Sequence, residues 1–393
     1  MAKIAIVAHN VSVPLSKHRS KEFFDRIYFL ARRYDEIHLI SKEEKIKKGD
    51  RISVRDDLIA NIIIHRVPNG LLASSTEIQK IFRSIDIDLV FADSIKHGAS
   101  SILCKKKYGV PLVTFVQGYE AELKAIALKL RLGIEPNPGL LSNIFALHDL
   151  IVLRTSDKVL CVSPGLVDYA RSLLPKRDWG KVGFIPHSLE YVKRIPKEAM
   201  MWAGELISSL KIDKDLLLMT IGIGPLKGTG IALKAHKYIV ERYPNAVMIL
   251  AGKTVDLKYV KMARELGLNE NVLFLSLPRD RVLALLSHSS IFLSASFSEG
   301  FSWAVSEAMA LGIPVIAYVN KSLEDAAAKK AIMGTKTLDP RDYAMALESL
   351  IRDENLRLEI VKNAKNYISP FVSFSENARL KMICDIINSL LEK

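Results

Sequence analysis

The sequence predicts an α/β protein built from two doubly wound, Rossmann-like domains. Strand-length apolar runs alternate with longer amphipathic stretches along the chain, and a segment without strand periodicity divides this alternation into two series. The length of 393 residues also exceeds that of one ordinary core. Hydrophobic residues make up 49% of the chain and charged residues 25%, which excludes a disordered or fibrous protein.

The first series predicts an N-terminal domain over residues 1–188. Its predicted strands are residues 3–8, 36–40, 62–67, 89–92, 111–116, 158–162 and 182–185. The amphipathic stretches between them predict helices, including residues 21–33 and 94–108. Strands that alternate with helices in this way predict a parallel sheet covered by helices on both faces.

The second series predicts a C-terminal domain over residues 189–370. The connection begins in the stretch 186–213, which contains Pro186 and Pro196 and shows no strand period. The predicted strands are residues 215–221, 246–251, 272–275, 291–294 and 314–317, and the predicted helices include residues 229–243, 256–266 and 302–311. From Asp339 onward the pattern is helical, and Pro370 predicts a break before a last helix over 375–391.

Charge and cysteine content narrow the class of protein. Lys and Arg total 56 against 43 acidic residues, a net charge of +13 that favours polyanionic partners. No run approaches the roughly 18 uncharged apolar residues of a spanning helix. The N-terminal run predicts a first strand rather than a signal peptide, so we expect an intracellular, cytoplasmic protein. The three cysteines, Cys104, Cys161 and Cys384, argue against disulfide, zinc or redox chemistry, and we expect no metal and no cofactor.

The most informative segment runs from residue 296 to residue 317. A predicted strand ends at residue 294, a loop carries Glu299 and Gly300, and a helix begins near Ser302. The backbone N–H groups of Phe301 and Ser302 would lie at the positive end of this helix, where a phosphate is favoured, and Gly300 permits close approach of the backbone. The segment therefore predicts an anion site.

Glu307 lies about one turn into that helix among apolar residues. An unpartnered carboxylate there would be costly, so it needs a hydrogen-bond donor. The vicinal hydroxyls of a ribose suit a carboxylate, which accepts two hydrogen bonds in a fork. The alternative is that Glu307 pairs with a Lys or Arg, or reaches solvent.

These residues resemble a known signature. Glu299 and Glu307, separated by seven residues and followed by Ala308-Met-Ala-Leu-Gly-Ile-Pro-Val-Ile-Ala, are similar to the Glu-x7-Glu motif of the retaining GT-B glycosyltransferases of family GT4. The order of the preceding segments is similar too, namely 159–166, 183–190, Lys227-Gly228 and 271–275. The resemblance covers nearly all of the second half of the chain and the first half more weakly.

The resemblance implies the GT-B architecture, two domains that face a central cleft, with the C-terminal helix 371–393 crossing back to the first domain. It implies an enzyme that moves a sugar, with retention and without a metal, from a UDP- or GDP-sugar in the second domain to a glycan or lipid-linked acceptor in the first. Glu307 would bind the ribose and Glu299 the donor sugar, while Gly300, Phe301 and Ser302 would lie against the diphosphate. A nucleotide-sugar epimerase shares this architecture, but the motif favours a transferase.

A glycine-rich loop over residues 221–230 is the second signal. It is not a Walker A motif, because Lys227 precedes its glycine, and it lacks the third glycine of the Rossmann fingerprint. The resemblance implies that Gly224 and Gly228 shape the loop against the donor and that Lys227 stabilises the leaving diphosphate. The family's Arg position holds Ile223, so we expect another cation to act there. The candidates are Lys253, Arg279 and Arg281. The alternative is that Lys227 caps a surface turn.

The first domain carries the predicted acceptor side. Gln117 stands where many family members have a His beside the transferring sugar, and glutamine is no base at neutral pH. We expect Gln117 to position the sugar while the departing diphosphate takes the acceptor proton. Glu120 and His9 are the acceptor-side candidates. The alternative for Glu120 and Glu122 is two exposed carboxylates in the first turn of a helix.

The basic residues suit two kinds of polyanionic partner, a membrane surface and a nucleic acid. Lys124, Lys129 and Arg131 surround apolar positions such as Ile126, which fits either a helix in the interface of an anionic membrane or a packed helix with a solvated basic face. A nucleic-acid partner is disfavoured, because no recognition motif is present and aromatic residues make up only 7% of the chain.

Two functions therefore remain from the sequence. The first is a retaining hexosyltransferase of glycan biosynthesis, acting in the cytoplasm or as a peripheral protein at the cytosolic face of a membrane. The second is a glycosyltransferase-like partner subunit that binds nucleotide or glycan with little or no turnover, which the departures at Ile223 and Gln117 motivate. Release of nucleoside diphosphate from a sugar donor distinguishes them.

Overall fold

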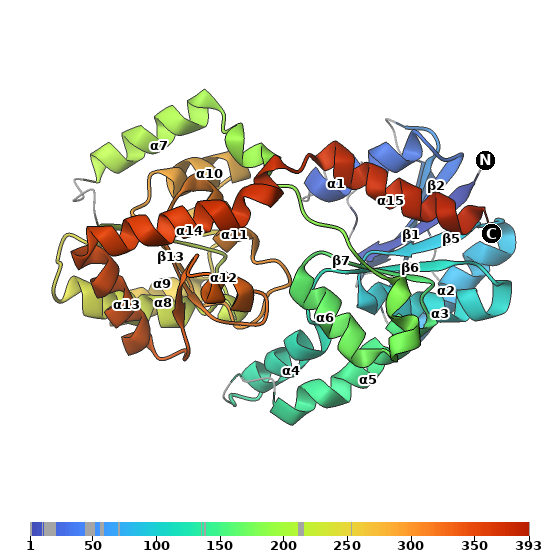
Figure 1. Cartoon of the computed structure of the whole chain (residues 1–393), viewed down its shortest axis with the longest axis horizontal. Coiled ribbons are helices and arrows are strands. Elements are labelled where there is room, and N and C mark those ends of the chain that lie inside the picture. Colours follow the sequence, from blue (N-terminus) through green and yellow to red (C-terminus); the bar gives the residue numbers. More distant parts are fainter. Residues whose placement is uncertain are drawn as a thin grey trace. The chain divides into compact units, whose positions relative to one another are not determined.

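The computed structural model describes residues 2–9, 11, 21–43, 52–55, 59–69, 71–134, 136, 139–210, 216–252 and 254–392. The chain forms two compact units, each with its own sheet (Figure 1). The first unit comprises Met1–Ala125, Pro138–His187 and Glu376–Lys393, and the second comprises Ile126–Asn137 and Ser188–Ser375. The predicted class, α/β with two doubly wound domains, is confirmed.

The first unit holds an eight-stranded sheet of order β3-β4-β2-β1-β5-β6-β7-β8. Its strands are β1 (Lys3–His9), β2 (Glu36–Glu43), β3 (Ile52–Arg55), β4 (Ile62–Pro68), β5 (Leu89–Ala92), β6 (Leu112–Val116), β7 (Lys158–Cys161) and β8 (Val182–Phe184). All neighbouring pairs are parallel except β3 and β4. The edge strand β3 was not predicted, because its residues, Ile52-Ser-Val-Arg, form no continuous apolar run like that of β5.

Helices cover both faces of this sheet (Figure 1). They are α1 (Lys21–Ala31), α2 (Leu71–Ser84), α3 (Ile95–Tyr108), α5 (Gly139–Thr155), α6 (Pro164–Leu173), the short η2 (Lys176–Lys181) and α15 (Glu376–Leu391). Helix α4 (Glu120–Arg131) begins in this unit, and its residues from Ile126 onward belong to the second unit. Apolar side chains of α2 and α3 form a core with β1, β2, β4 and β5. Helices α1 and α15 lie on the opposite face, where Tyr34 Oη donates to Asn388 Oδ1 at 2.9 Å and ties α15 to this unit.

The second unit holds a six-stranded, all-parallel sheet of order β11-β10-β9-β12-β13-β14. Its strands are β9 (Leu217–Ile221), β10 (Val247–Gly252), β11 (Val272–Ser276), β12 (Ile291–Ser294), β13 (Val315–Tyr318) and β14 (Met333–Thr335). Its helices are η3 (Glu190–Lys193), α7 (Lys197–Ser209), η5 (Pro225–Lys227), α8 (Thr229–Val240), α9 (Leu257–Glu265), α10 (Arg279–Ser287), α11 (Trp303–Leu311), α12 (Glu324–Ala328), α13 (Pro340–Arg352) and α14 (Glu354–Ser373). One apolar core packs α7, α10, α11 and α14 on one face, and another packs α8, α9 and α13 on the other (Figure 1).

The predicted helix break at Pro370 is wrong, because α14 continues through it to Ser373. Proline has no N–H to donate to the carbonyl of Asn366, four residues earlier. Ser369 Oγ donates to that carbonyl instead, at 3.1 Å. The N–H of Phe374 then donates to the carbonyl of Pro370 at 3.1 Å and closes the last turn. A neighbouring serine therefore replaces the hydrogen bond that proline removes.

Strand order fixes where ligands gather in such sheets. In the second sheet the order reverses between β9 and β12, and in the first between β1 and β5. Loops leave the carboxyl ends of two adjacent strands in opposite directions at such a point, which opens a crevice. The segments singled out in the sequence, 221–230 and 296–303, follow β9 and β12 directly.

Candidate active site

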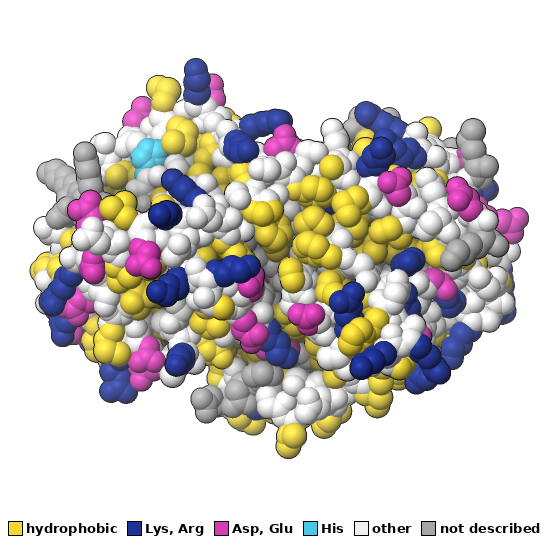
Figure 2. Space-filling view, in the orientation of Figure 1, with side chains coloured by type: hydrophobic (Ala, Val, Ile, Leu, Met, Phe, Trp, Pro, Cys, Tyr) yellow, Lys and Arg dark blue, Asp and Glu magenta, His cyan; other side chains and the backbone are white. Residues whose placement is uncertain are grey.

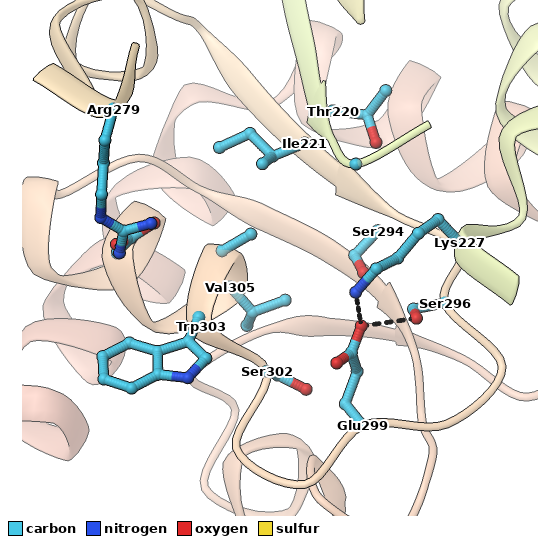
Figure 3. Close-up of a pocket in the computed structure, with 13 residues that line it drawn as sticks. Thr220, Ile221, Lys227, Arg279, Ser294, Ser296, Glu299, Ser302, Trp303 and Val305 are labelled. Carbon is cyan, nitrogen blue, oxygen red and sulfur yellow. Dashed lines mark hydrogen bonds and ion pairs between the residues drawn. The ribbon is translucent and has the colours of Figure 1, made fainter. Parts of the chain in front are cut away.

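A pocket lies in the second unit between the carboxyl ends of β9 and β12 and the start of α11 (Figure 3). The predicted residues that line it are Lys227, Arg279, Glu299, Ser302 and Glu307, and the others are Thr220, Ile221, Gly222, Ser294, Ser296, Trp303, Ala304 and Val305. Its volume of about 160 Å³ is below the roughly 300–1,000 Å³ of typical ligand pockets. Ion pairs between facing side chains occupy part of the space that a larger ligand would need.

Lys227 and Glu299 form one of these pairs. Lys227 ends η5 after β9, Glu299 lies in the loop after β12, and Lys227 Nζ contacts Glu299 Oε1 (Figure 3). Ser296 Oγ donates to the same carboxylate oxygen at 2.7 Å. The ammonium group of Lys227 therefore lies in the pocket, and the alternative of a surface turn cap is wrong.

Glu307 forms the second pair, with Arg279. Its side chain is 2% exposed in α11, and its Oε1 accepts hydrogen bonds from Arg279 Nη2 and Tyr191 Oη. Arg279 Nη2 also donates to Tyr191 Oη at 2.7 Å. Burial raises the pKa of the Glu307 carboxyl, and Arg279 and Tyr191 oppose that shift. The structure without ligand therefore contains the alternative given in the sequence analysis, a Glu307 paired with an arginine.

Tyr191 is the contact that sequence reasoning missed. It lies in η3, in the stretch interpreted as a connection, and is separated from Glu307 by 116 residues. No local motif marks it. The stacking of Arg279 on its ring, at 5.1 Å from the centroid, shows that Tyr191 also orients the arginine.

The start of α11 supplies a positive helix end to the pocket. Ser302, predicted as the helix start, is its N-cap and has a left-handed backbone with φ of 52°. Its side chain does not cap the helix, and Ser302 Oγ lies 2.8 Å from Ser322 Oγ instead. Phe301 packs edge-on against Trp303 at 5.1 Å between ring centroids, so its ring belongs to the apolar packing beside the pocket. Gly300 precedes it in the loop.

The glycine-rich loop is held tightly against the end of β12. At Gly228, the N-cap of α8, φ is 65° and a Cβ would lie 2.2 Å from the carbonyl oxygen of Ala295. Only glycine fits there. Gly224 and Gly228 are not among the lining residues, so the structure gives them a role in loop shape, and Gly222 lines the pocket.

The three cations predicted to replace the family's arginine differ in where the structure places them. Ile223 packs toward Gly252, where an added Cβ would lie 3.4 Å from the isoleucine side chain. Arg279 lines the pocket, whereas Arg281, two residues on, stacks over Trp202 at 4.7 Å. Lys253 lies outside the described residues. Arg279 is therefore the substitute that the geometry supports.

The predicted acceptor-side residues lie in the first unit, at the carboxyl ends of its strands. Gln117 follows β6, and its Nε2 donates to the carbonyl oxygen of Asp93 at 2.7 Å and to Asp93 Oδ1 at 3.1 Å. His9 ends β1. Glu120 begins α4, and burial raises the pKa of its carboxyl. Glu122 is only 7% exposed, so the alternative of two exposed carboxylates is wrong for this residue.

Within the described ranges, no group of three or more His, Cys, Asp or Glu side chains is placed to hold a metal ion. All three cysteines are buried and form no disulfide bond.

Comparison with known proteins agrees with this geometry. The family model described as glycosyl transferases group 1 matches residues 206–367, and that of Glycosyltransferase Family 4 matches residues 27–189. The putative glycosyltransferase YtcC of Bacillus subtilis is 25% identical over 42% of this chain and 44% of its own length. The UDP-Gal:alpha-D-GlcNAc-diphosphoundecaprenol alpha-1,3-galactosyltransferase of Escherichia coli is 24% identical over 79% of this chain and 78% of its own. A D-inositol 3-phosphate glycosyltransferase of Corynebacterium kroppenstedtii is 27% identical over 43% of this chain and 39% of its own length. The match with YtcC and the match with the Corynebacterium enzyme each span less than half of that relative's length.

Solved structures show the same fold over the full chain. Sucrose-phosphate synthase from Thermosynechococcus elongatus superposes with a TM-score of 0.73 at 14% identity and covers 100% of both chains. Anabaena HepE, solved in complex with UDP and glucose, gives 0.67 at 16% identity and covers 99% of this chain and 100% of its own. With the Glu-x7-Glu segment in its pocket and family models matching both halves, the chain belongs to the group 1 glycosyltransferases of GT-B fold.

Proposed function

We propose that the chain transfers a sugar from a UDP- or GDP-sugar to a glycan or lipid-linked acceptor, with retention of anomeric configuration, and that the donor binds the pocket of the second unit. The observation that carries this proposal is the convergence of Lys227, Glu299 and Glu307 on one pocket at the start of α11. A diphosphate needs cations and backbone N–H groups, and sugar hydroxyls need carboxylates. The pocket offers both.

The two ion pairs divide the pocket into a phosphate end and a ribose end. When the ribose hydroxyls donate to Glu307, Arg279 is released and its guanidinium turns to the diphosphate, where the family has its missing arginine. Lys227 leaves Glu299 for the diphosphate, and Glu299 accepts hydrogen bonds from hydroxyls of the transferring sugar. Fixed positive charge around the leaving group lowers the barrier to its departure.

The transfer step needs no protein base. The bond between the anomeric carbon and the diphosphate oxygen breaks, the acceptor oxygen bonds to that carbon on the same face, and the acceptor proton passes to the departing diphosphate. This supports a role for Gln117 in positioning rather than proton transfer. Its Nε2 is engaged by Asp93, which leaves the amide oxygen as an acceptor for a substrate hydroxyl.

The relatives support UDP as the first donor to test. HepE was solved with UDP, and the Escherichia coli relative is named as a galactosyltransferase that uses UDP-Gal and a diphosphoundecaprenol acceptor. A lipid-linked acceptor would place this chain at the cytosolic face of a membrane.

We place the membrane contact on α5. Among the described residues, no helix is long and apolar enough to cross a bilayer. Side chains of α5 spaced four, three and four residues apart are exposed, namely Leu140 (81%), Ile144 (67%), Leu147 (59%) and Ile151 (51%). Separate apolar side chains project at the lower margin of Figure 2, where Figure 1 places α4 and α5. On α4, by contrast, Ile126 is 1% exposed, which supports the packed-helix reading of that helix.

Basic residues on the face drawn in Figure 2 lie scattered among acidic and apolar side chains. Any membrane attraction would therefore combine the apolar stripe of α5 with nearby lysines such as Lys124, whose Nζ lies 3.4 Å from His148 Nδ1 of α5.

A second candidate function is binding without turnover, which the Arg279–Glu307 pair across the ribose end favours. The experiment is release of nucleoside diphosphate from a panel of UDP- and GDP-sugars, with the anomer of any transferred sugar assigned by NMR. We expect release from one nucleotide class and a product with the donor's configuration. A donor that stabilises the protein against heat but is recovered intact would contradict the transferase and support the binding module.

A further inference from the structure

A second cluster of polar side chains lies in the first unit, at the point where its strand order reverses. His9 ends β1, Lys42 is its register partner near the end of β2, and Lys96 and His97 lie in the first turn of α3. Of these residues, His9 is the predicted acceptor-side candidate. The cluster stands at the carboxyl edge of the sheet, where a doubly wound domain binds its ligand.

Lys42 is a buried ammonium group without an acidic partner among the described residues. Its side chain is 1% exposed, and Nζ donates to Ser100 Oγ at 2.6 Å. Ser74 Oγ of α2 donates to the same serine at 3.2 Å. Burial, aided by the charge of Lys96, lowers the pKa of Lys42 to about 8. A buried charge is normally paired, because desolvation without a counter-charge is costly.

His97 presents a second buried donor. It is 7% exposed, its Nδ1 lies 3.0 Å from Ser94 Oγ, and its Nε2 is buried without a hydrogen-bond partner in the described part of the chain. When Ser94 Oγ donates its hydrogen to Nδ1, the ring hydrogen lies on Nε2 and makes that atom a donor. Burial and then Lys42, Lys96 and His9 lower the pKa of His97 to about 3, so the ring is neutral at neutral pH.

The surroundings are cationic. Each charged group that acts on His97 is a lysine or a histidine. Helices α2 and α3 both begin at this edge, and neither has an acidic residue in its first turn. Carboxylates also lie near this edge: Asp93 precedes Ser94 and pairs with Arg26, Glu43 follows Lys42 and pairs with Arg66, and the carboxyl of Glu120 senses the charge of Lys96. The edge therefore combines cations, an imidazole N–H and positive helix ends, which together suit an anion.

We propose that this cluster binds a phosphate group of the acceptor, so that the substrate class is a phosphate monoester or a diphosphate-linked sugar. The inference rests on the proposed function, in which the first unit holds the acceptor. Lys96 is exposed and would contact the phosphate first, while His97 and Lys42 are buried behind it and would supply a hydrogen bond and charge. The phosphate provides the counter-charge that Lys42 lacks among its described neighbours.

The test is calorimetric titration of the full chain with glycerol 3-phosphate and with pyrophosphate. Lys96→Ala is expected to weaken binding about ten- to hundredfold, the usual effect of losing one charge-assisted hydrogen bond. The matched control is Lys106→Ala, an exposed lysine in the last turn of the same helix, which should bind as the native chain does. Equal binding by the native chain and Lys96→Ala, or equal loss in both variants, would overturn the proposal.

Lys42→Met separates a ligand role from a structural one. If Lys42 serves the fold, the variant should unfold at a lower temperature than the native chain. If Lys42 serves to bind an anion, the thermal midpoint of the variant should be unchanged or higher while its phosphate binding falls. If the variant fails to fold, the Lys96 comparison still decides.

Failure of this inference is distinguishable from failure of the proposed function. Lys227→Ala removes the phosphate end of the donor pocket and should leave glycerol 3-phosphate binding intact. Turnover without any dependence on Lys96 would overturn the phosphate site alone, and phosphate binding at Lys96 without turnover would overturn the transferase alone. Vesicles of phosphatidic acid, compared with phosphatidylcholine, show whether the phosphate belongs to a lipid headgroup or to a soluble substrate, and binding to neither source would overturn the site.

Discussion

Replacement of Glu307 by alanine is expected to abolish the stabilisation of the second unit by UDP or GDP. A nucleotide at about 100 times its dissociation constant adds roughly 2.7 kcal/mol to the folded state, a shift of several degrees in the midpoint of unfolding. The hydrogen bonds from ribose to a buried carboxylate are charge-assisted, and losing them weakens binding about ten- to hundredfold. A thermal-shift panel with UDP, GDP, ADP and their sugar conjugates measures the effect.

Two further variants make that panel decisive. Glu307 is buried against Arg279 and Tyr191, so alanine also removes structural hydrogen bonds, and the midpoint without nucleotide reports any such loss. Glu307→Gln keeps the shape and should lose most of the nucleotide effect. Glu324→Ala, an exposed carboxylate in α12, should respond as the native chain does. Full stabilisation of both Glu307 variants would refute the ribose role.

Replacement of Arg279 by methionine is expected to lower kcat about a hundredfold, the usual order of loss for one group that stabilises developing charge. Ile223 leaves the family's arginine position apolar, and Arg279 is the described cation, besides Lys227, that lines the pocket. Arg281→Met is the matched control, because Arg281 lies on the same helix but stacks over Trp202.

The arginine variant also separates binding from catalysis. Because Arg279 pairs with Glu307, its removal frees the carboxylate for the ribose, so nucleoside binding should hold or tighten while kcat falls. Steady-state kinetics of nucleoside diphosphate release, with binding measured separately, checks both. Equal losses in the Arg279 and Arg281 variants would show that Arg279 has no special role.

Much of this fold follows from local sequence. The strands β5 and β12 end at the residues predicted from their apolar runs, because an unbroken run of buried apolar residues marks a central strand of a parallel sheet. Glu299 and Glu307 share one strand–loop–helix segment, so their spacing alone predicts that they face one site. The three-residue strand β14 and the helix through Pro370 escaped prediction, because a single tertiary neighbour or one serine hydroxyl decides them.

The pairing inside the site was beyond local patterns. Lys227 meets Glu299 across 72 residues, Arg279 meets Glu307 across 28, and Tyr191 meets Glu307 across 116. Each contact depends on which strands are neighbours in the sheet, and the sequence specifies that order only through the whole packed core. Local motifs therefore identified the donor-side groups, whereas their partners emerged from the topology.

The central claim is that the pocket of the second unit is a nucleotide-sugar site, and the most direct measurement is a crystal structure of the chain with UDP. The account predicts ribose hydroxyls on Glu307, the diphosphate against Lys227 and the start of α11, and Arg279 turned from Glu307 toward the phosphates. UDP bound elsewhere, with the Arg279–Glu307 and Lys227–Glu299 pairs intact, would contradict it.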